Sequence, residues 1–489
     1  MNFQVAQSIA PVAAGLCTAG VFVSSVVATA AAPPPGDPMR QEVVVIKAGK
    51  VITVSGEEYA PGEIVIIDGK VELVGRGLEY PKPARVIEAP YETVMPGFVH
   101  PHSRYGMARY SASGVHGNYK ADEYAVVDDI EFEDFLKAGF TTVCYFANGT
   151  GIPGTSVVYR TGGAEDDRVL KGTSYLRVTM SRPSRDKRAF AGALDKAKAE
   201  IDKVEKAKKE WEEAQKKKKE EEEAAKKKQQ EEDAKKEGGQ PEKKADAAGK
   251  GDEKKENGED GEKPAEPEKF EPPKIDPAVQ PLVDWLEGNL AMPPLIEVSS
   301  ASDVVHFDDV MKKWEDKELA YRLYLTRGGD YNYVMNRLVE GETIVMSDLG
   351  VRTLPQTMIT FNMVGELFAA GCEIALVPVY DAPVGFDRFR ADVTELIRYG
   401  ITREEALRAV TLNSAKLIGV DDRVGSIEKG KDADFVFVNG DDPLDPLARI
   451  SRVMILGETV WESEDDADPR AMRSMSVPQG GGRGGRRGN

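Results

Sequence analysis

Two of the chain's four histidines stand one residue apart in the segment VMPGFVHPHSRYG, residues 94–106. Side chains of a β-strand alternate between its two faces, so His100 and His102 would point the same way from a single strand. Two imidazoles on one face are a common way of holding a divalent metal such as zinc. The pair is therefore the first candidate for chemistry, and the surrounding elements must decide whether further ligands reach it.

The overall balance of residues limits the class of protein. The chain has 489 residues, of which 30% are charged, and a formal net charge of -18 at pH 7. This length indicates two domains or one large barrel with additions. The acidic balance argues against nucleic acid or an anionic membrane surface as a partner of the main body.

Residues 1–32 have the pattern of a cleavable signal peptide. Their uncharged run PVAAGLCTAGVFVSSVVATAAA ends in small residues and is followed by a proline-rich stretch. We expect an exported protein, periplasmic or extracellular, with an N-terminal membrane anchor as the alternative because the run is nearly long enough to span a bilayer. After cleavage only Cys144 and Cys372 remain, which we expect to be buried thiols, and a disulfide scaffold is excluded.

The pattern of strands and helices predicts an α/β fold. Residues 42–93 and 421–463 both read as short strands punctuated by glycine, with DGK at residues 68–70 as a hairpin turn. We therefore expect one small β-sandwich domain built from both chain ends. Strand-like and helical runs alternate over residues 94–420, which predicts a (β/α)8 TIM-like barrel. The last barrel helix is expected within ITREEALRAVTLNSAKLIG, residues 401–419, with Thr402 and Glu405 forming its capping box.

The Lys/Glu-rich segment 196–273 interrupts the barrel pattern and is low in complexity. Apolar residues at near-helical spacing up to Trp211 predict that its start packs against the body. Beyond Trp211, unlike charges four residues apart, such as Glu222 and Lys226, favour a solvated helix. Later residues cannot form a core, so we expect a solvated charged insertion between two barrel elements. Residues 464–489 are expected to form a flexible tail.

These features together resemble one known family. The split β domain, the barrel between its halves, VMPGFVHPHS at the first barrel strand and ALRAVTLNSAKLIGVDDRVGSIEKGKDADFVF near the end are similar to the amidohydrolase superfamily, and within it to the imidazolonepropionase-like and dipeptidase-like branch. The resemblance covers roughly residues 42–194 and 275–463. GSIEKGKDADFVF would mark the return of the chain from the barrel to the sheet domain.

The resemblance implies hydrolysis of C–N bonds in amides, cyclic amides or peptides. One or two divalent metals at the carboxyl ends of barrel strands would activate water, and an aspartate of the last strand would accept its proton. The family's first strand carries Asp-x-His-x-His. Here His100 takes the aspartate position, His102 the first ligand position and Arg104 the second, and a guanidinium offers no lone pair to a metal.

The later strands depart from the family pattern as well. Glu297 in PLIEVSSASDV stands at the fifth-strand histidine position, and Arg327 or Thr326 at the sixth. Asp381 in VYDAPVG matches the final aspartate, and is the candidate metal-binding and proton-accepting carboxylate. No confident fourth-strand ligand is present, since Lys171 fits only loosely and is expected at the surface. Outside the family motifs, His306 is expected to be structural and His116 to be a solvated loop residue, with a place at the barrel mouth as the alternative. Asp348 ends a strand and is expected either to face the site or to cap the next turn.

The candidate metal ligands are His102, His100, Glu297 and Asp381, with zinc the favoured metal if one binds. One interpretation is an exported pseudoenzyme with a degenerate metal site and weak or lost hydrolase activity, serving as a binding subunit that pairs with copies of itself or with an active relative. Arg104 and Arg327 would then bind a carboxylate-bearing small molecule or peptide. A second is an active single-metal hydrolase with Asp381 as general base. A third is an envelope scaffold acting through the charged insertion.

Overall fold

The computed structural model describes residues 41–125, 129–181, 183–236, 269–326, 330–340, 344–348, 350–353 and 356–463. The chain divides into two compact units, Met1–Gln41 and Glu42–Asn489, and every helix and strand of the described residues lies in the second. Arg327, the expected signal peptide, the second half of the charged insertion and the expected tail lie outside the described residues.

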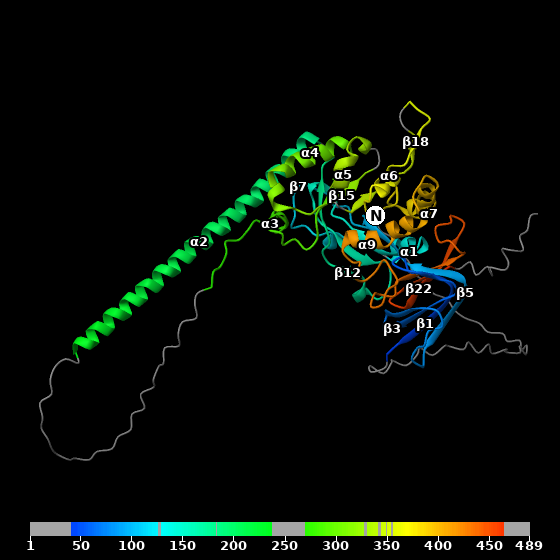
Figure 1. Cartoon of the computed structure of the whole chain (residues 1–489), viewed down its shortest axis with the longest axis horizontal. Coiled ribbons are helices and arrows are strands. Elements are labelled where there is room, and N and C mark those ends of the chain that lie inside the picture. Colours follow the sequence, from blue (N-terminus) through cyan, green and yellow to red (C-terminus); the bar gives the residue numbers. More distant parts are fainter. Residues whose placement is uncertain are drawn as a thin grey trace, which may run out of the picture. The chain divides into compact units, whose positions relative to one another are not determined.

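The two ends of this unit meet in one mixed sheet. Its order is β22-β21-β20-β5-β1-β3-β4, with β2 paired to β1. Figure 1 shows the blue N-terminal strands and the orange-red β22 in the same part of the fold. The two chain ends therefore share one sheet, whereas a separate domain and a sandwich of two facing sheets stay predictions. The strands are β1 (Val43–Ile52), β2 (Glu58–Tyr59), β3 (Gly62–Ile67), β4 (Lys70–Gly75), β5 (Arg85–Pro96), β20 (Phe435–Asn439), β21 (Arg449–Ile455) and β22 (Glu458–Glu462).

Local sequence explains this sheet. Valine, isoleucine and phenylalanine dominate its strands, and residues such as Ile46, Val94 and Phe437 form a buried cluster between them. The turn between β3 and β4 is formed by Asp68 and Gly69, whose φ values of 50° and 76° suit a tight hairpin. The expected hairpin at DGK is therefore confirmed.

Parallel strands form two further groups. β6 (Phe98–Ser103) pairs with β8 (Phe140–Tyr145), and the second group has the order β13 (Leu176–Thr179), β14 (Leu295–Val298), β15 (Arg322–Leu325), β16 (Val345–Ser347) and β19 (Ile374–Leu376). Each strand coincides with an apolar run expected to be a barrel strand. Helices separate most of these strands along the chain, which confirms the α/β character. Closure of the two groups into one barrel stays a prediction.

The remaining elements connect or cover these strands. The short strands are β7 (Ala112–Val115), β9 (Gly149–Ile152), β10 (Gly154–Thr155), β11 (Val157–Arg160), β12 (Val169–Lys171), β17 (Arg352–Thr353) and β18 (Thr360–Phe361). The helices are α1 (Asp129–Lys137), α2 (Pro183–Lys236), α3 (Gln280–Leu286), α4 (Ala301–Met311), α5 (Met335–Glu340), α6 (Met363–Ala369), α7 (Pro383–Arg398), α8 (Arg403–Val410) and α9 (Leu412–Ile418). The 3-10 turns are η1 (Ala121–Tyr124), η2 (Glu165–Asp167), η3 (Lys312–Lys317) and η4 (Tyr331–Tyr333).

Helix α2 contains the first half of the charged insertion. Leu194, Ala197 and Ile201 are buried in the main core, whereas most later described side chains of the helix are exposed. The ring of Trp211 lies 5.7 Å from that of Phe270, centroid to centroid. A packed start and a solvated continuation are both confirmed. Within the described ranges, no helix combines the length and the apolar character needed to cross a membrane.

The last barrel helix is interrupted. Thr402 and Glu405 form the expected capping box of α8. The single helix expected to continue to the glycine at 419 breaks at Thr411, where φ is -130° and ψ is -88°. The hydroxyl of Thr411 donates to the carbonyl of Leu407 at 2.6 Å, a local bond that competes with the helical ladder.

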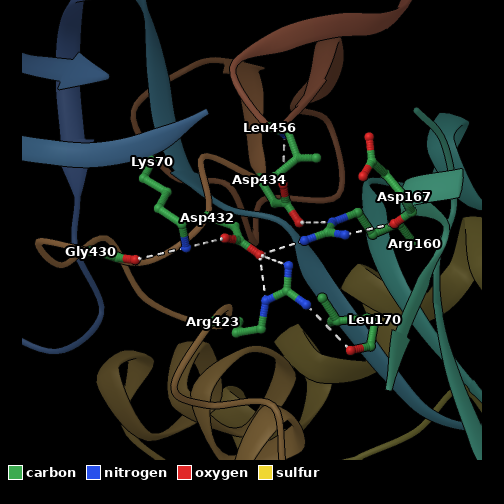
Figure 2. A network of polar contacts seen from close by, with 9 residues as sticks. All are labelled: Lys70, Arg160, Asp167, Leu170, Arg423, Gly430, Asp432, Asp434 and Leu456. Carbon is green, nitrogen blue, oxygen red and sulfur yellow. Dashed lines mark hydrogen bonds and ion pairs between the residues drawn. The ribbon is translucent and has the colours of Figure 1, made fainter. Parts of the chain in front are cut away.

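A buried ionic network links Asp432 and Asp434, which precede β20, to Arg160 of β11 (Figure 2). Arg160 at the end of β11 is 2% exposed and donates to Asp432 through Nη2 and to Asp434 through Nε, the latter at 3.2 Å. Arg423 lies 2.8 Å and Lys70 3.0 Å from Asp432. Burial raises the pKa of Asp434, although Arg160 acts against this. The sequence KDAD just before β20 therefore joins three distant parts of the unit.

Candidate functional site

A cavity of about 460 Å³ lies where several parallel strands end. The residues directly after β6 form one wall, Asn148 after β8 forms another, and Asp381 after β19 closes it. Because carboxyl ends of parallel strands meet at one edge, this is where an α/β fold places its functional residues. We call this space the mouth cavity.

The carboxylate of Asp381 is hydrogen-bonded to the end of β6 and to the residue that follows it. The hydroxyl of Ser103 donates to its Oδ1 at 2.6 Å, and the backbone N–H of Arg104 donates to its Oδ2 at 2.7 Å. His100 Nε2 lies 3.5 Å from Oδ1. Burial alone would raise the pKa of this carboxyl, but His100, Ser103 and the Arg104 amide together lower it below its ordinary value. Asp381 is therefore a carboxylate at neutral pH.

A glycine in the first turn of α7 allows Asp381 to take this position. A Cβ atom on Gly385 would lie 1.9 Å from the carbonyl oxygen of Tyr380, which is closer than any contact permits. Pro383 opens the helix, where its missing N–H costs no hydrogen bond. The sequence YDAPVG thus encodes a tight turn that presents Asp381 to the cavity.

His100 is buried rather than open to the mouth cavity. It is 1% exposed, and the rings of Phe135, Phe140 and Phe386 surround it at centroid distances of 5.5 to 6.0 Å. Its Nδ1 accepts the backbone N–H of His102 at 3.4 Å, so we assign the ring proton to Nε2, facing Asp381. The separation of 3.5 Å is long for a hydrogen bond, and within the described chain Nε2 has no better partner.

His102 makes a different set of contacts. Its Nδ1 lies 2.8 Å from the hydroxyl of Tyr175, which itself donates to the carbonyl of Pro101 at 3.1 Å. Its ring stacks on Phe146, with centroids 3.7 Å apart. Burial, and then the positive charge of Arg177, lower the pKa of His102 well below its ordinary value. The imidazole is therefore neutral.

Glu297 forms an ion pair with Arg177. Arg177 on β13 donates to its Oε2 through Nε at 2.9 Å and through Nη2 at 2.5 Å. Nη1 of the same guanidinium donates to the carbonyls of Ala147 and Gly149. Sequence reasoning missed Arg177, and the available signal was an arginine within the apolar run YLRVTM.

The predicted metal ligands do not converge. Of the four, the structure brings only His100 and Asp381 face to face, and it turns His102 toward Tyr175 and Glu297 toward Arg177. Among the described residues, no three His, Cys, Asp or Glu side chains are grouped so that they could hold a metal ion. The expected ligand set is therefore not assembled, and the donors present do not fit a divalent metal.

Arginine and tyrosine side chains form much of the lining of the mouth cavity. Arg104 and Arg109 both line it and are exposed, and neither has an acidic partner among the residues that the structure describes. Tyr110 and Tyr124 form part of the wall, with rings stacked 3.9 Å apart. Sequence reasoning identified Arg104 but not Arg109, whose signal was the repeated Arg-Tyr of SRYGMARY.

The other two histidines and Lys171 lie elsewhere. His116 stacks on Tyr119, and His306 lies 3.5 Å from Lys187 Nζ. Lys171 donates to the carbonyl of Gly419 at 2.8 Å and is half-buried, so the expected surface position is wrong. None of these lines the mouth cavity.

Two further predictions concern Asp348 and the cysteines. Asp348 lines a separate small cavity of about 60 Å³. Cys144 and Cys372 are both free thiols. Cys144 is buried, which raises its pKa to about 12, whereas Cys372 is only partly buried.

Comparison with known proteins shows which fold and which family this chain resembles. The structure resembles that of an amidohydrolase from Thermotoga maritima MSB8, with a TM-score of 0.61 and 21% sequence identity, over 86% of this chain and 100% of that one. Residues 388–460 match the model of the amidohydrolase family. The fold is therefore that of an amidohydrolase, and the family model matches the C-terminal part of the chain. The family match begins in α7 and ends in β22, so it includes Asp432 and Asp434 of the network in Figure 2, whereas the residues that line the mouth cavity lie outside it.

Curated relatives match over short segments. An imidazolonepropionase of Shewanella frigidimarina (strain NCIMB 400) is 57% identical over 37 residues, 8% of this chain and 9% of that protein. An N-acetylglucosamine-6-phosphate deacetylase of Rattus norvegicus is 38% identical over 66 residues, 14% of this chain and 15% of that protein. The chain thus matches well under two thirds of either relative, and its place in the imidazolonepropionase-like and dipeptidase-like branch stays a prediction.

Proposed function

We propose that this amidohydrolase-like protein binds a carboxylate-bearing small molecule or peptide in its mouth cavity and has weak or no C–N hydrolase activity. The observation that carries the proposal is the pair of exposed arginines, Arg104 and Arg109, that line the cavity without an acidic partner in the described part of the chain. A guanidinium presents a planar fork of N–H donors that matches a carboxylate.

The rest of the cavity suits such a ligand. The stacked rings of Tyr110 and Tyr124 offer an apolar face for the part of the ligand that carries no charge. A volume of about 460 Å³ is in the range of ordinary small-molecule sites. Asp381 adds one acceptor at the strand end, and so a ligand with an N–H group as well as a carboxylate fits better than a simple dianion.

The reduced hydrolase activity follows from the donor arrangement. A catalytic zinc site in a protein needs about three protein ligands and an open position. Members of this superfamily typically bind divalent metals, but here His102 is bonded to Tyr175 and Glu297 to Arg177. We therefore propose a degenerate metal site, and derive no step through a metal.

Ligand binding tests the proposal directly. Isothermal titration of the mature protein with a panel of dicarboxylates, N-acetyl amino acids and dipeptides should find a binder. Arg104→Ala and Arg109→Ala should each weaken its binding by roughly 10- to 100-fold, the loss expected for one charged hydrogen-bonded contact. Arg398→Ala, an exposed arginine of α7 outside the cavity, is the matched control. Equal affinity in all three variants would contradict the proposal.

The active-hydrolase alternative is decided by a second measurement. The mature protein is incubated with zinc, freed of excess and analysed for metal content, then assayed with dipeptides and cyclic amides. About one retained zinc, lost in His102→Ala and Asp381→Ala, together with turnover, would replace the binding role by single-metal hydrolysis.

Export and partnership complete the proposal. The apolar run within residues 1–32 supports export, and N-terminal sequencing of the protein recovered outside the cytoplasm would locate the cleavage site. A binding subunit of this kind would pair with an active relative or with a second copy. Size-exclusion chromatography of the protein alone, and then mixed with a purified active amidohydrolase from the same cell, tests both.

A further inference from the structure

We propose that the ion pair of Arg177 with Glu297 takes the place of the metal in this fold, so that a guanidinium is the resident cation between the strands. The inference is independent of the ligand proposed for the mouth cavity, because it concerns side chains that do not line that cavity and their contribution to stability. It starts from the failure of the predicted ligands to converge.

The pair lies where side chains of several strands meet. His102 comes from β6, Arg177 from β13 and Glu297 from β14. The ring of His102 lies 5.0 Å from that of Tyr324 on β15, although β6 and β15 each pair with other strands in the described sheets. The cluster is therefore enclosed between facing strands, as the residues that hold a metal in this type of fold would be.

The guanidinium makes four hydrogen bonds in this position. Arg177 is 7% exposed, and each of its three nitrogens donates at least one hydrogen bond. Two of them bind Glu297, and the third binds the carbonyls of Ala147 and Gly149 in the chain leaving β8. The guanidinium also lies over the ring of Phe146, 4.6 Å from its centroid. One cation thus links β13, β14 and the end of β8, as metal–ligand bonds would.

The same contacts prevent a divalent metal from binding there. An arginine side chain keeps its charge at all accessible pH values, and like charges a few ångströms apart repel strongly where water is excluded. Glu297, the carboxylate that a metal would need, already accepts two N–H groups. His102 is neutral and has a lone pair, but it stacks on Phe146, the ring that Arg177 covers.

Thermal unfolding of the wild-type protein provides the first test. Melting temperatures are measured with EDTA, with no addition and with zinc chloride, alongside metal analysis. We expect all three temperatures to agree within about 1 °C, because a ligand that binds only the native state would raise them. A protein that retains about one zinc and melts lower in EDTA would overturn the inference.

Substitutions of Arg177 and Glu297 test whether the guanidinium stabilises the fold. Arg177→Met leaves Glu297 buried without a partner, whereas Arg177→Met with Glu297→Leu removes both charges. We expect the single variant to melt at least roughly 5 °C below the double variant, since an unpaired buried charge destabilises more than a missing pair. Zinc should raise the melting temperature of Arg177→Met alone, because a carboxylate and a neutral imidazole are then free. Lys429→Met, which breaks an exposed ion pair with Glu72, is the control.

The outcomes separate the possible causes. Equal melting temperatures for the single and double variants, with no response to zinc in either, would contradict the role given to Arg177. If Arg177→Met does not fold, a folded double variant supports the inference, and a double variant that also fails to fold contradicts it. None of these results depends on ligand binding at Arg104 and Arg109, so failure of the proposed function would be recognised separately.

Discussion

The imidazole of His102 lies flat against the ring of Phe146, with centroids 3.7 Å and planes 5° apart. A charged imidazolium would lose its hydration in this stack and would face Arg177. Burial therefore holds the pKa of His102 well below its ordinary value of 6.5. His102 therefore packs against an aromatic ring in the core, although its spacing from His100 is typical of metal ligands.

This stack predicts how stability depends on pH. Below about pH 6.5 the unfolded chain binds a proton at His102 that the folded protein does not, so the free energy of unfolding falls as pH decreases. The slope should approach about 1.4 kcal/mol per pH unit for this one group. Urea unfolding at pH 7.5, 6.5 and 5.5 should show a shallower slope for His102→Gln, and an unaltered slope for His116→Gln. The same slope in wild type and His102→Gln would refute the assignment.

Gly385 should be needed for both the fold and the cavity. A methyl group there would press on the Tyr380 carbonyl and displace Asp381. Gly385→Ala should cost about 1–3 kcal/mol of stability, a typical penalty for overpacking, and should weaken ligand binding in the mouth cavity. Gly192→Ala, in α2 with nothing near its Cβ, should instead gain about 0.5–1 kcal/mol. Chemical denaturation and titration measure the two effects, and equal stability of the two variants would contradict the turn's role.

Asp432 should be among the most sensitive positions of the protein. Asp432→Asn removes the negative charge shared by Arg160, Arg423 and Lys70, of which Arg160 is fully buried. Arg160 keeps Asp434 as a carboxylate partner, so the loss of its second charged hydrogen-bond partner should cost about 1–3 kcal/mol. Glu72→Gln, which breaks an exposed ion pair, should cost about 1 kcal/mol or less. Urea unfolding of the two variants gives the comparison, and a loss below about 1 kcal/mol for Asp432→Asn would count against the network.

The charged insertion should be removable. Because the rings of Trp211 and Phe270 lie 5.7 Å apart, a short Gly-Ser linker can replace residues 213–268. Far-ultraviolet circular dichroism should lose helix signal, while the melting temperature of the body stays within about 2 °C, since the described side chains of α2 after Trp211 are mostly exposed. The scaffold hypothesis predicts in addition that this deletion abolishes contacts with envelope partners, which cross-linking would show. A lower melting temperature would mean that the insertion supports the body.

Local patterns predicted most of the fold. The apolar runs, the DGK hairpin and the capping box at Thr402 each depend on residues close together in the sequence, and all are present. The helix break at Thr411 was not predicted, because a threonine in a helical run is normally tolerated and here its side chain binds a backbone carbonyl.

The site was harder to predict because its contacts join distant residues. The pairing of Arg177 with Glu297 spans 120 residues and leaves no local pattern. Aligning Glu297 with a metal ligand was reasonable for its residue type, but the side chain's partner comes from another strand. Arg109 lines the cavity because of the path of an irregular loop. Hydrophobic periodicity predicts helices and strands but not the path of such a loop. Asp381 could be predicted because its neighbours, a proline and a glycine, encode the turn that holds it.

The position of β20 has a consequence for how the protein is made. β5 ends at Pro96 and its neighbour β20 begins at Phe435, so one edge of β5 lacks its partner until roughly 340 more residues have been synthesised. At about 5–20 residues per second this interval lasts about 17 to 70 s. Throughout it the nascent chain exposes an apolar strand edge that can pair with other chains. Expression of this protein should therefore depend strongly on chaperones that hold nascent chains.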